Sequence, residues 1–175
     1  MNVPEILHPG GFTFRPLNPS DTQAVFAIHA DEMTRLYTRL LRQQTPDEIE
    51  SWLRYYPHYK RHGYGIWAII HKKSGALVGL CGLRVRKDLD GATDLSYRMH
   101  PDWRRQGIAR AAVGACISFG FERLNLPEIW SQVHRDNEFS HRIMLEYAFE
   151  ITAADSEWIT YLLTAERFSA AAIAP

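Results

Sequence analysis

The stretch Met99-His100-Pro101-Asp102-Trp103-Arg104-Arg105-Gln106-Gly107-Ile108-Ala109 carries the strongest local signal in the chain. A β-rich run ends at its first residue, a polar loop follows, and a helical pattern begins at Gly107. Free backbone N–H groups at a helix start, with the positive end of the helix dipole, bind anions. Gly107 allows a phosphate to approach the main chain, and Arg104 and Arg105 add positive charge. The stretch predicts a phosphate-binding loop, although an ordinary solvated helix cap has the same pattern.

The same stretch differs from the two common nucleotide-binding motifs. It lacks the Gly-Lys-Ser/Thr ending of a P-loop, and it lacks the three spaced glycines of a dinucleotide fingerprint. These two classes of nucleotide-binding protein are therefore excluded, and other phosphate-bearing ligands stay open.

The composition is that of one globular domain, which we expect to span residues 1–175. Twenty Lys and Arg balance 20 Asp and Glu, and 46% of the residues are hydrophobic. Nucleic acids and anionic membranes are held by excess Lys and Arg, so neither is an expected partner. The sequence shows no signal peptide or membrane span, and two distant cysteines, Cys81 and Cys116, indicate a reduced, intracellular chain. His58 and His62 have the spacing of a metal pair but lack a third ligand nearby. We expect a cytoplasmic chain without a bound metal.

Periodicity predicts an alternation of strands and helices. We expect strands at residues 12–15, 65–71, 76–85, 94–99, 129–133, 149–151 and 158–163. We expect a helix capped by Ser20 or Asp21 and further helices at residues 33–41, 45–56, 107–122 and 137–147, a turn at residues 87–91, and a loose tail at residues 168–175. This order predicts an α/β (α+β) fold, with a mixed, mostly antiparallel sheet of six to seven strands and helices on both faces.

Four motifs in the expected order resemble the GNAT superfamily of N-acetyltransferases. Arg104-x-x-Gly107-x-Ala109 is similar to the family's Gln/Arg-x-x-Gly-x-Gly/Ala signature. Residues 77–83, Leu-Val-Gly-Leu-Cys-Gly-Leu, and residues 94–101, Asp-Leu-Ser-Tyr-Arg-Met-His-Pro, resemble its third and fourth strands. Asn137-x-x-Ser140, closing at Ala148-Phe149, resembles its last helix, with Ala148 in place of the usual Gly. The resemblance extends from residue 12 to residue 163, and the Asn-x-x-Ser variant is similar to the branch of ribosomal-protein alanine and serine N-acetyltransferases.

The resemblance implies acetyl-CoA as cosubstrate, in a cleft between residues 95–99 and residues 129–133. Its pantetheine arm would pair with strand backbone, and its pyrophosphate would rest on the backbone N–H groups of residues 104–109. A backbone N–H near Met99 would hold the thioester carbonyl and then the oxyanion. The cofactor-binding residues implied in this way are Leu95, Tyr97, Met99, Arg104, Arg105, Gln106, Gly107, Ile108, Ala109, Arg110, Asn137 and Ser140.

The base of the reaction is left open by the sequence. The acceptor amine must attack in its neutral form, and an α-amino group with a pKa near 8 is about 10% neutral at pH 7. Asp94 stands where relatives often carry Glu and would act through a water molecule; a solvated turn acid is the alternative interpretation. His134 has the better intrinsic pKa but a less secure place in the family pattern, and water alone is the third candidate.

The acid that protonates the departing thiolate is expected on the last helix. Met144 occupies the position of the Tyr that many relatives use, so Ser140 on the same helix face is the replacement candidate. Tyr147 is expected to pack, and Asn137 is either a ligand of the cofactor arm or a helix N-cap. Met99, Asp94 and Ser140 are therefore the candidate catalytic positions.

These observations predict acetyl transfer from acetyl-CoA to a primary amine by direct attack in a ternary complex. The acceptor is a protein N-terminus or a small amine, and Arg35, Arg39 and Arg42 are either a solvated helix face or a receptor for an acidic acceptor. The rival function is a non-catalytic acyl-CoA sensor or partner-docking module on the same fold. A homodimer is compatible with either function.

Overall fold

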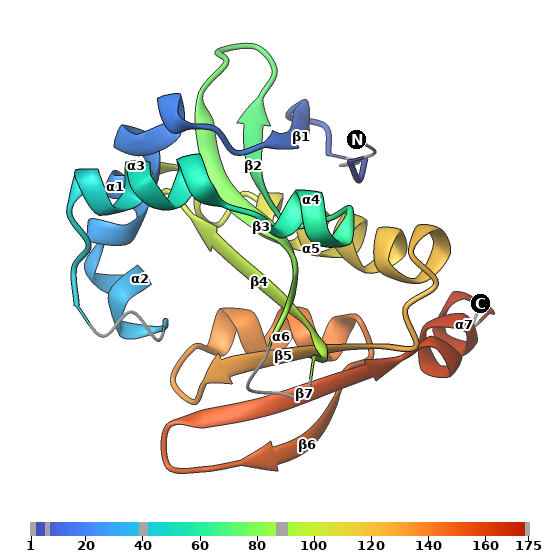
Figure 1. Ribbon diagram of the computed structural model, residues 1–175. Helices are drawn as coiled ribbons and strands as arrows, with labels where there is room; N and C mark the ends of the chain where they lie inside the picture. Colours follow the sequence, from blue (N-terminus) through green and yellow to red (C-terminus); the bar gives the residue numbers. More distant parts are fainter. Residues whose placement is uncertain (1–2, 6–7, 39–41, 87–90, 174–175) are drawn as a thin grey trace.

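A seven-stranded sheet forms the centre of the computed structural model, which describes residues 3–5, 8–38, 42–86 and 91–173 (Figure 1). The strands follow the order β1-β2-β3-β4-β5-β7-β6, and of the neighbouring pairs only β4 and β5 run parallel. The expected mixed, mostly antiparallel sheet is confirmed. The strand bounds are β1 (Phe12–Pro16), β2 (Ile66–His71), β3 (Leu77–Val85), β4 (Thr93–Met99), β5 (Glu128–His134), β6 (Glu150–Ala154) and β7 (Trp158–Thr164).

Helices cover both faces of the sheet, as the sequence predicted. Two hydrophobic clusters lie on opposite faces: α1 and α3 contribute to one, and α5 and α6 contribute to the other. Side chains of a strand alternate between faces, so Ile66 and Ala68 join the first cluster while Trp67 and Ile69 join the second. The helix bounds are α1 (Thr22–Ala30), α2 (Glu32–Leu36), α3 (Pro46–Tyr55), α4 (His58–His62), α5 (Ile108–Ser118), α6 (Glu138–Glu146) and α7 (Ala165–Ile173).

The start of α3 forms as its sequence predicted. Thr45 is the N-cap, Pro46 opens the helix, and the Glu48 N–H donates to Thr45 Oγ1 at 3.3 Å. The Thr45 N–H in turn donates to Glu48 Oε2 at 2.8 Å, which completes a capping box. This helix start depends only on residues that are close in the chain.

The end of α6 explains the Ala148-Phe149 ending of the last motif. The Ala148 N–H donates to the Leu145 carbonyl and the Phe149 N–H to the Met144 carbonyl, each at 3.0 Å, which is the Schellman arrangement. Ala148 has a φ of +61°, in the left-handed region that favours glycine. The chain therefore keeps the glycine conformation at a position where it carries alanine.

Four expectations about local structure need correction or lie partly outside the described residues. The helix expected at residues 33–41 ends at Leu36, and residues 39–41 lie outside the described part. The tail expected to be loose is helical, because α7 runs from Ala165 to Ile173 and Phe168 stacks on Phe121 at 4.8 Å between ring centroids. The helix expected at residues 107–122 ends as α-helix at Ser118 and continues as a π-helical turn to Arg123. Of the turn at residues 87–91, only Gly91 is described.

The parallel strands β4 and β5 separate soon after they meet. The two strands pair at one register position, Asp94 opposite Trp130, and the Ser131 hydroxyl donates to the Leu95 carbonyl at 3.2 Å just beyond it. Figure 1 shows the two strands diverging toward their carboxyl ends. The second half of β4 therefore borders an opening in the sheet instead of a neighbouring strand.

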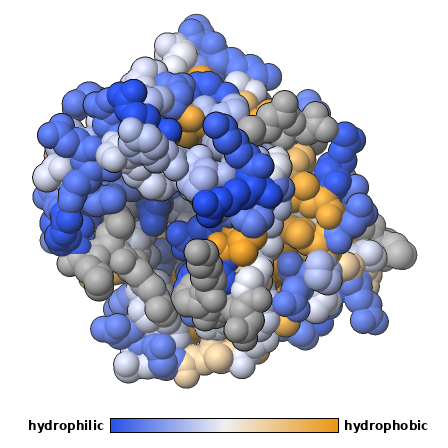
Figure 2. All heavy atoms as spheres, viewed as in Figure 1, coloured by the Kyte–Doolittle hydropathy of each residue, from blue (hydrophilic) through white to orange (hydrophobic). Residues whose placement is uncertain are grey.

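Among the described residues, no helix has the length and apolar character needed to cross a bilayer. The face in Figure 2 is mainly hydrophilic, with small groups of apolar residues.

Candidate active site

Two cavities meet where β4 and β5 diverge. The larger, about 740 Å³, lies between the end of β4, the loop before α5, the start of α5, α6 and α2. The smaller, about 210 Å³, lies between the ends of β3, β4 and β5. The residues that line both cavities are Tyr37, Thr38, Tyr97, Arg98, Asn137 and Ser140. A molecule in the larger cavity can therefore touch a molecule in the smaller one at this junction.

The start of α5 offers unsatisfied backbone donors to the larger cavity. Gly107 is the N-cap with a φ of +76°, and its position has no side-chain cap. Arg105 also adopts a positive φ, +60°, so the loop turns twice through the left-handed region before the helix begins. N–H groups exposed in this way at a helix start form an anion site.

The arginines of this loop have partners of their own. Arg104 forms an ion pair with Asp31 of the α1–α2 junction and donates to Thr34 Oγ1 at 3.1 Å. Arg110 Nε donates to Glu146 Oε1 at 2.6 Å. Their charges are balanced within the protein, so the anion site depends mainly on the main chain of the loop.

Arg105 differs from its neighbours. Its guanidinium lies 5.3 Å from the centre of the Phe139 ring and has no ion-pair partner within the described ranges. It is the loop arginine with charge available to a ligand.

Most residues that the resemblance assigned to the cofactor line the larger cavity. These are Tyr97, Met99, Arg104, Arg105, Gly107, Ile108, Ala109, Arg110, Asn137 and Ser140. Leu95 lines the smaller cavity instead, together with Asp94. Gln106 lines neither: its side chain donates to the Asp102 carbonyl at 3.1 Å, and its own carbonyl lies 2.8 Å from His8 Nε2.

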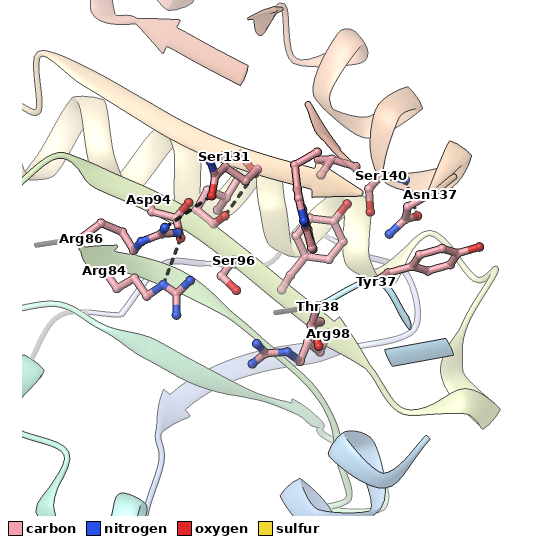
Figure 3. A pocket seen from close by; sticks show the side chains of 15 residues that line it. Tyr37, Thr38, Arg84, Arg86, Asp94, Ser96, Arg98, Ser131, Asn137 and Ser140 are labelled. Atoms are coloured by element: carbon pink, nitrogen blue, oxygen red, sulfur yellow. Dashed lines mark hydrogen bonds and ion pairs between the residues drawn. The ribbon is translucent and has the colours of Figure 1, made fainter. Parts of the chain in front are cut away.

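Asp94 is buried at one end of the smaller cavity, between two arginines (Figure 3). Arg84 Nε donates to Asp94 Oδ2 at 3.0 Å, and Arg86 Nη1 lies 3.7 Å from the same oxygen. A water or amine that gives a proton to Asp94 has to compete with these guanidinium groups. Asp94 is therefore both a candidate base and the anchor of an arginine cluster.

His134 lies outside the lining of both cavities. Its ring packs 5.6 Å from the ring of Tyr37 and 5.4 Å from that of Trp158, both measured between centroids, and it is not among the residues that line either cavity. Tyr37, which packs on His134, lines both cavities, so His134 is adjacent to the junction through this side chain.

Ser140 and Tyr97 face one another at the junction. The hydroxyl of Tyr97 is buried. Among the described residues it has no hydrogen-bond partner at normal distance and angle, but it lies close enough to the Ser140 side chain to interact with it. Burial raises the pKa of Tyr97, so its phenol stays protonated at neutral pH. The pair places two hydroxyl groups beside the point where the cavities meet.

The other polar and apolar positions of α6 have structural roles. The side-chain oxygen of Asn137 accepts from the Ser140 N–H at 3.1 Å, so Asn137 is the helix N-cap, while its amide nitrogen points into the cavity (Figure 3). Met144 is fully buried in the core. Tyr147 packs as predicted, with its hydroxyl donating to the Arg110 carbonyl at 3.0 Å.

Sequence reasoning missed the positive charge of the smaller cavity. It considered Arg35, Arg39 and Arg42, but Arg35 and Arg42 line neither cavity, and Arg39 lies outside the described residues. The cavity is lined instead by Arg84, Arg86 and Arg98. Strand alternation was the available signal, since Asp94 and Arg98 share one face of β4 and Arg84 lies opposite Asp94 on β3.

The charge of Arg98 also affects a buried neighbour, His29 of α1. Burial and the charge of Arg98 lower the pKa of His29 to about 4, and the ring Nδ1 donates to Gln44 Oε1 at 2.8 Å. His29 is therefore neutral in the folded protein at pH 5, whereas the unfolded chain binds a proton there with a pKa of about 6.5.

We expect this difference to make stability fall between pH 6.5 and pH 4. The unfolded state binds more protons in this window, so the free energy of unfolding drops by about 2 kcal/mol from pH 7 to pH 5 on account of His29. Urea unfolding of the native protein and of His29→Leu at both pH values checks this. The pH-dependent loss should be about 2 kcal/mol smaller in the variant, and an equal loss in both proteins would contradict the assignment.

The parallel strands diverge beside a helix that starts at a glycine, which is the arrangement that the sequence resemblance led us to expect for an acetyl-CoA cleft. The family model described as "Acetyltransferase (GNAT) domain" matches residues 12–150. The chain belongs to the GNAT acetyltransferase family, and it is an acetyl-CoA-dependent acetyltransferase.

Individual relatives agree with this family. The chain is 27% identical over 147 residues to the "Uncharacterized N-acetyltransferase YoaA" of Bacillus subtilis, covering 83% of this chain and 82% of the relative. The ribosomal-protein-S5-alanine acetyltransferase of Vibrio fischeri superposes with a TM-score of 0.76 at 16% identity, over 95% of this chain and 99% of that one. Mutant forms of the spermidine/spermine N-acetyltransferase SpeG of Vibrio cholerae superpose with a TM-score of 0.73 at 14% identity, over 92% and 98%. These two structures share the fold, and their names give different acceptors.

Proposed function

We propose that this acetyltransferase transfers the acetyl group to a primary amine by direct attack within a ternary complex. The observation that carries the proposal is the junction of the two cavities, because it lets a cosubstrate in the larger one meet an acceptor in the smaller one. No covalent acetyl-enzyme is needed. Cys81 and Cys116 are buried, which fits a mechanism without a thiol nucleophile.

The larger cavity offers binding groups for both the pyrophosphate and the pantetheine arm of acetyl-CoA. The start of α5 supplies free N–H groups, and the missing side chain of Gly107 leaves room for a pyrophosphate, with Arg105 adding charge. The second half of β4, which borders the opening, supplies backbone groups for the pantetheine arm. When bound, acetyl-CoA supplies an activated acetyl group.

The reacting groups meet at the junction. The amine nitrogen attacks the thioester carbonyl carbon, a C–N bond forms, the C–S bond breaks, and the amine loses one proton. A backbone N–H near Met99 holds the developing oxyanion. Ser140, with Tyr97 behind it, gives the departing thiolate its proton and regains one from water, while Asp94 through water, His134 or water alone takes the proton of the amine.

The acceptor is a protein N-terminus or a small molecule. The Asn137-x-x-Ser140 motif and the likeness to a ribosomal-protein alanine acetyltransferase support the first, and the modest size of the smaller cavity supports the second.

Calorimetric titration with acetyl-CoA, with ATP and NAD as controls, tests the cosubstrate. We expect saturable binding of acetyl-CoA with no binding of NAD. A transfer assay with a panel of primary amines then tests the reaction, with release of free thiol as the readout. Selective binding followed by acetylation supports the proposal, and absence of acetyl-CoA binding would contradict it.

The rival function, a non-catalytic acyl-CoA sensor, is not favoured, because the family model that matches residues 12–150 describes an acetyltransferase domain. Met144 is buried in the core at the position where the resemblance implies a Tyr acid, so the acid role falls to Ser140 instead. A sensor would bind acetyl-CoA but release no thiol with any amine, so the same two assays distinguish it from the enzyme.

A further inference from the structure

The smaller cavity carries an excess of positive charge. Among its described lining residues, the guanidinium groups of Arg84, Arg86 and Arg98 face a single carboxylate, that of Asp94. Figure 3 shows Arg84 and Arg86 converging on Asp94, with Arg98 extending from the same strand as Asp94. Arg84 and Arg86 already contact Asp94. Arg98 is therefore the arginine whose charge can act on a ligand in this cavity.

Arg98 is the arginine without a carboxylate of its own. Its Nε is buried without a hydrogen-bond partner, and no carboxylate of the described residues lies within ion-pair distance of it. Burial and the charge of Arg84 lower the pKa of Arg98 to about 10, so it is still a cation at neutral pH. A half-buried cation without a carboxylate at ion-pair distance is costly, and an anion brought by a ligand offsets this cost.

Arg98 is also placed to act on the acceptor during transfer. It lines both cavities, so a group bound to it lies close to the junction where the acetyl group is transferred. Its guanidinium presents a planar fork of donors that matches a carboxylate. An acceptor held there by a carboxylate can direct its amine toward the thioester.

On the basis of the proposed function, we propose that the acceptor is an amine that also carries a carboxylate, which Arg98 binds with Arg84 as the second cation. The cavity has about the volume of seven water molecules at roughly 30 Å³ each, which suits an acceptor the size of an amino acid. Polyamines carry several positive charges and are repelled by the same cluster. Arg98 thereby determines specificity, and Asp94 positions Arg84 beside it.

The test compares each carboxylate with its own neutral amide. The acceptors are alanine, β-alanine and glutamate, their amides, and spermidine, with kcat/KM measured for the native protein, Arg98→Gln and Arg98→Lys. We expect the carboxylate-to-amide ratio to fall about 30-fold in Arg98→Gln, the size of effect expected when a hydrogen bond between charged groups is lost. Arg98→Lys should retain part of the preference, since it keeps the charge without the fork.

The carboxylate-to-amide ratio of kcat/KM is taken within one variant. A lower fraction of folded protein reduces both values equally and therefore does not change the ratio. Arg54→Gln is the matched control, because Arg54 is an exposed arginine of α3 that pairs with Glu50 and lines neither cavity. Its ratio should equal that of the native protein. Thermal unfolding of Arg98→Gln shows whether the variant still folds cooperatively.

Short peptides with an acidic or an amidated second residue distinguish the two sources of the carboxylate. Turnover of the free amino acids assigns a small-molecule acceptor, and turnover restricted to the acidic peptide assigns a protein N-terminus; both support a carboxylate at Arg98. A preference for amides or spermidine, or a carboxylate preference that survives in Arg98→Gln, overturns this inference and leaves the proposed function standing. Absence of turnover with every amine overturns both.

Discussion

Gly107→Val is expected to weaken acetyl-CoA binding about 100-fold. Valine at the N-cap of α5 adds a branched side chain beside the free N–H groups, with its Cβ 3.6 Å from His8 Nε2, and the φ of +76° there strains any β-branched residue, so the loop has to shift. Loss of one or two hydrogen bonds to a charged phosphate, at about 1.5–3 kcal/mol each, accounts for an effect of this size. Calorimetric titration with acetyl-CoA measures it.

Gly75→Val separates this effect from general strain. Gly75 adopts a φ of +71°, has no heavy atom within 4 Å of the place a Cβ would take, and lies in the turn between β2 and β3, away from both cavities. Its variant should carry similar backbone strain and bind acetyl-CoA normally. If Gly107→Val also binds normally, the loop before α5 does not hold the pyrophosphate.

Ser140→Ala is expected to lower kcat about 100-fold while the acetyl-CoA dissociation constant stays within a factor of about two. General acid catalysis contributes about 100- to 10,000-fold, and the lower end applies because a thiolate with a pKa of about 8.5 is a fair leaving group. The substitution removes one oxygen at the junction but keeps the α6 cap, since the Ser140 N–H that bonds Asn137 belongs to the main chain. Steady-state kinetics and calorimetry provide the two measurements.

Ser169→Ala is the matched control, because Ser169 is an exposed serine of α7 whose hydroxyl donates to the Ala165 carbonyl at 2.9 Å. Its kcat should equal that of the native protein. The ratio of the two kcat values separates a role of Ser140 in transfer from a general effect of losing a serine hydroxyl. An unchanged kcat in Ser140→Ala would remove Ser140 from the mechanism and leave Tyr97 as the hydroxyl to test.

The candidate site could be predicted where it depends on a continuous stretch of chain. The loop from Arg104 to Gly107 and the start of α5 were found from the sequence, because a left-handed glycine followed by helix formers specifies its own conformation. The α6 motif was found for the same reason, although its Asn137 proved to be a helix cap as well as a cavity residue. The roles assigned to Asp94, Ser140 and Met99 stay predictions.

The tail illustrates why some local structure could not be predicted. Residues 168–175 are rich in alanine, which favours a helix but gives little apolar periodicity to recognise one. Helix α7 includes Phe168, which packs on Phe121, a residue 47 positions earlier (168 − 121). Tertiary packing therefore stabilises a helix that propensity alone left undecided.

The sequence by itself determined the sheet's class, the helix that begins at Gly107 and the family, because each depends on patterns that repeat or close within a few residues. Only the tertiary structure decided which charges meet. Arg104 pairs with Asp31, 73 residues away, instead of facing a phosphate freely, and Arg98 lies between two cavities that no single segment forms. The physical reason is that strand register and the divergence of β4 from β5 set these distances, and both depend on packing between segments far apart in the chain.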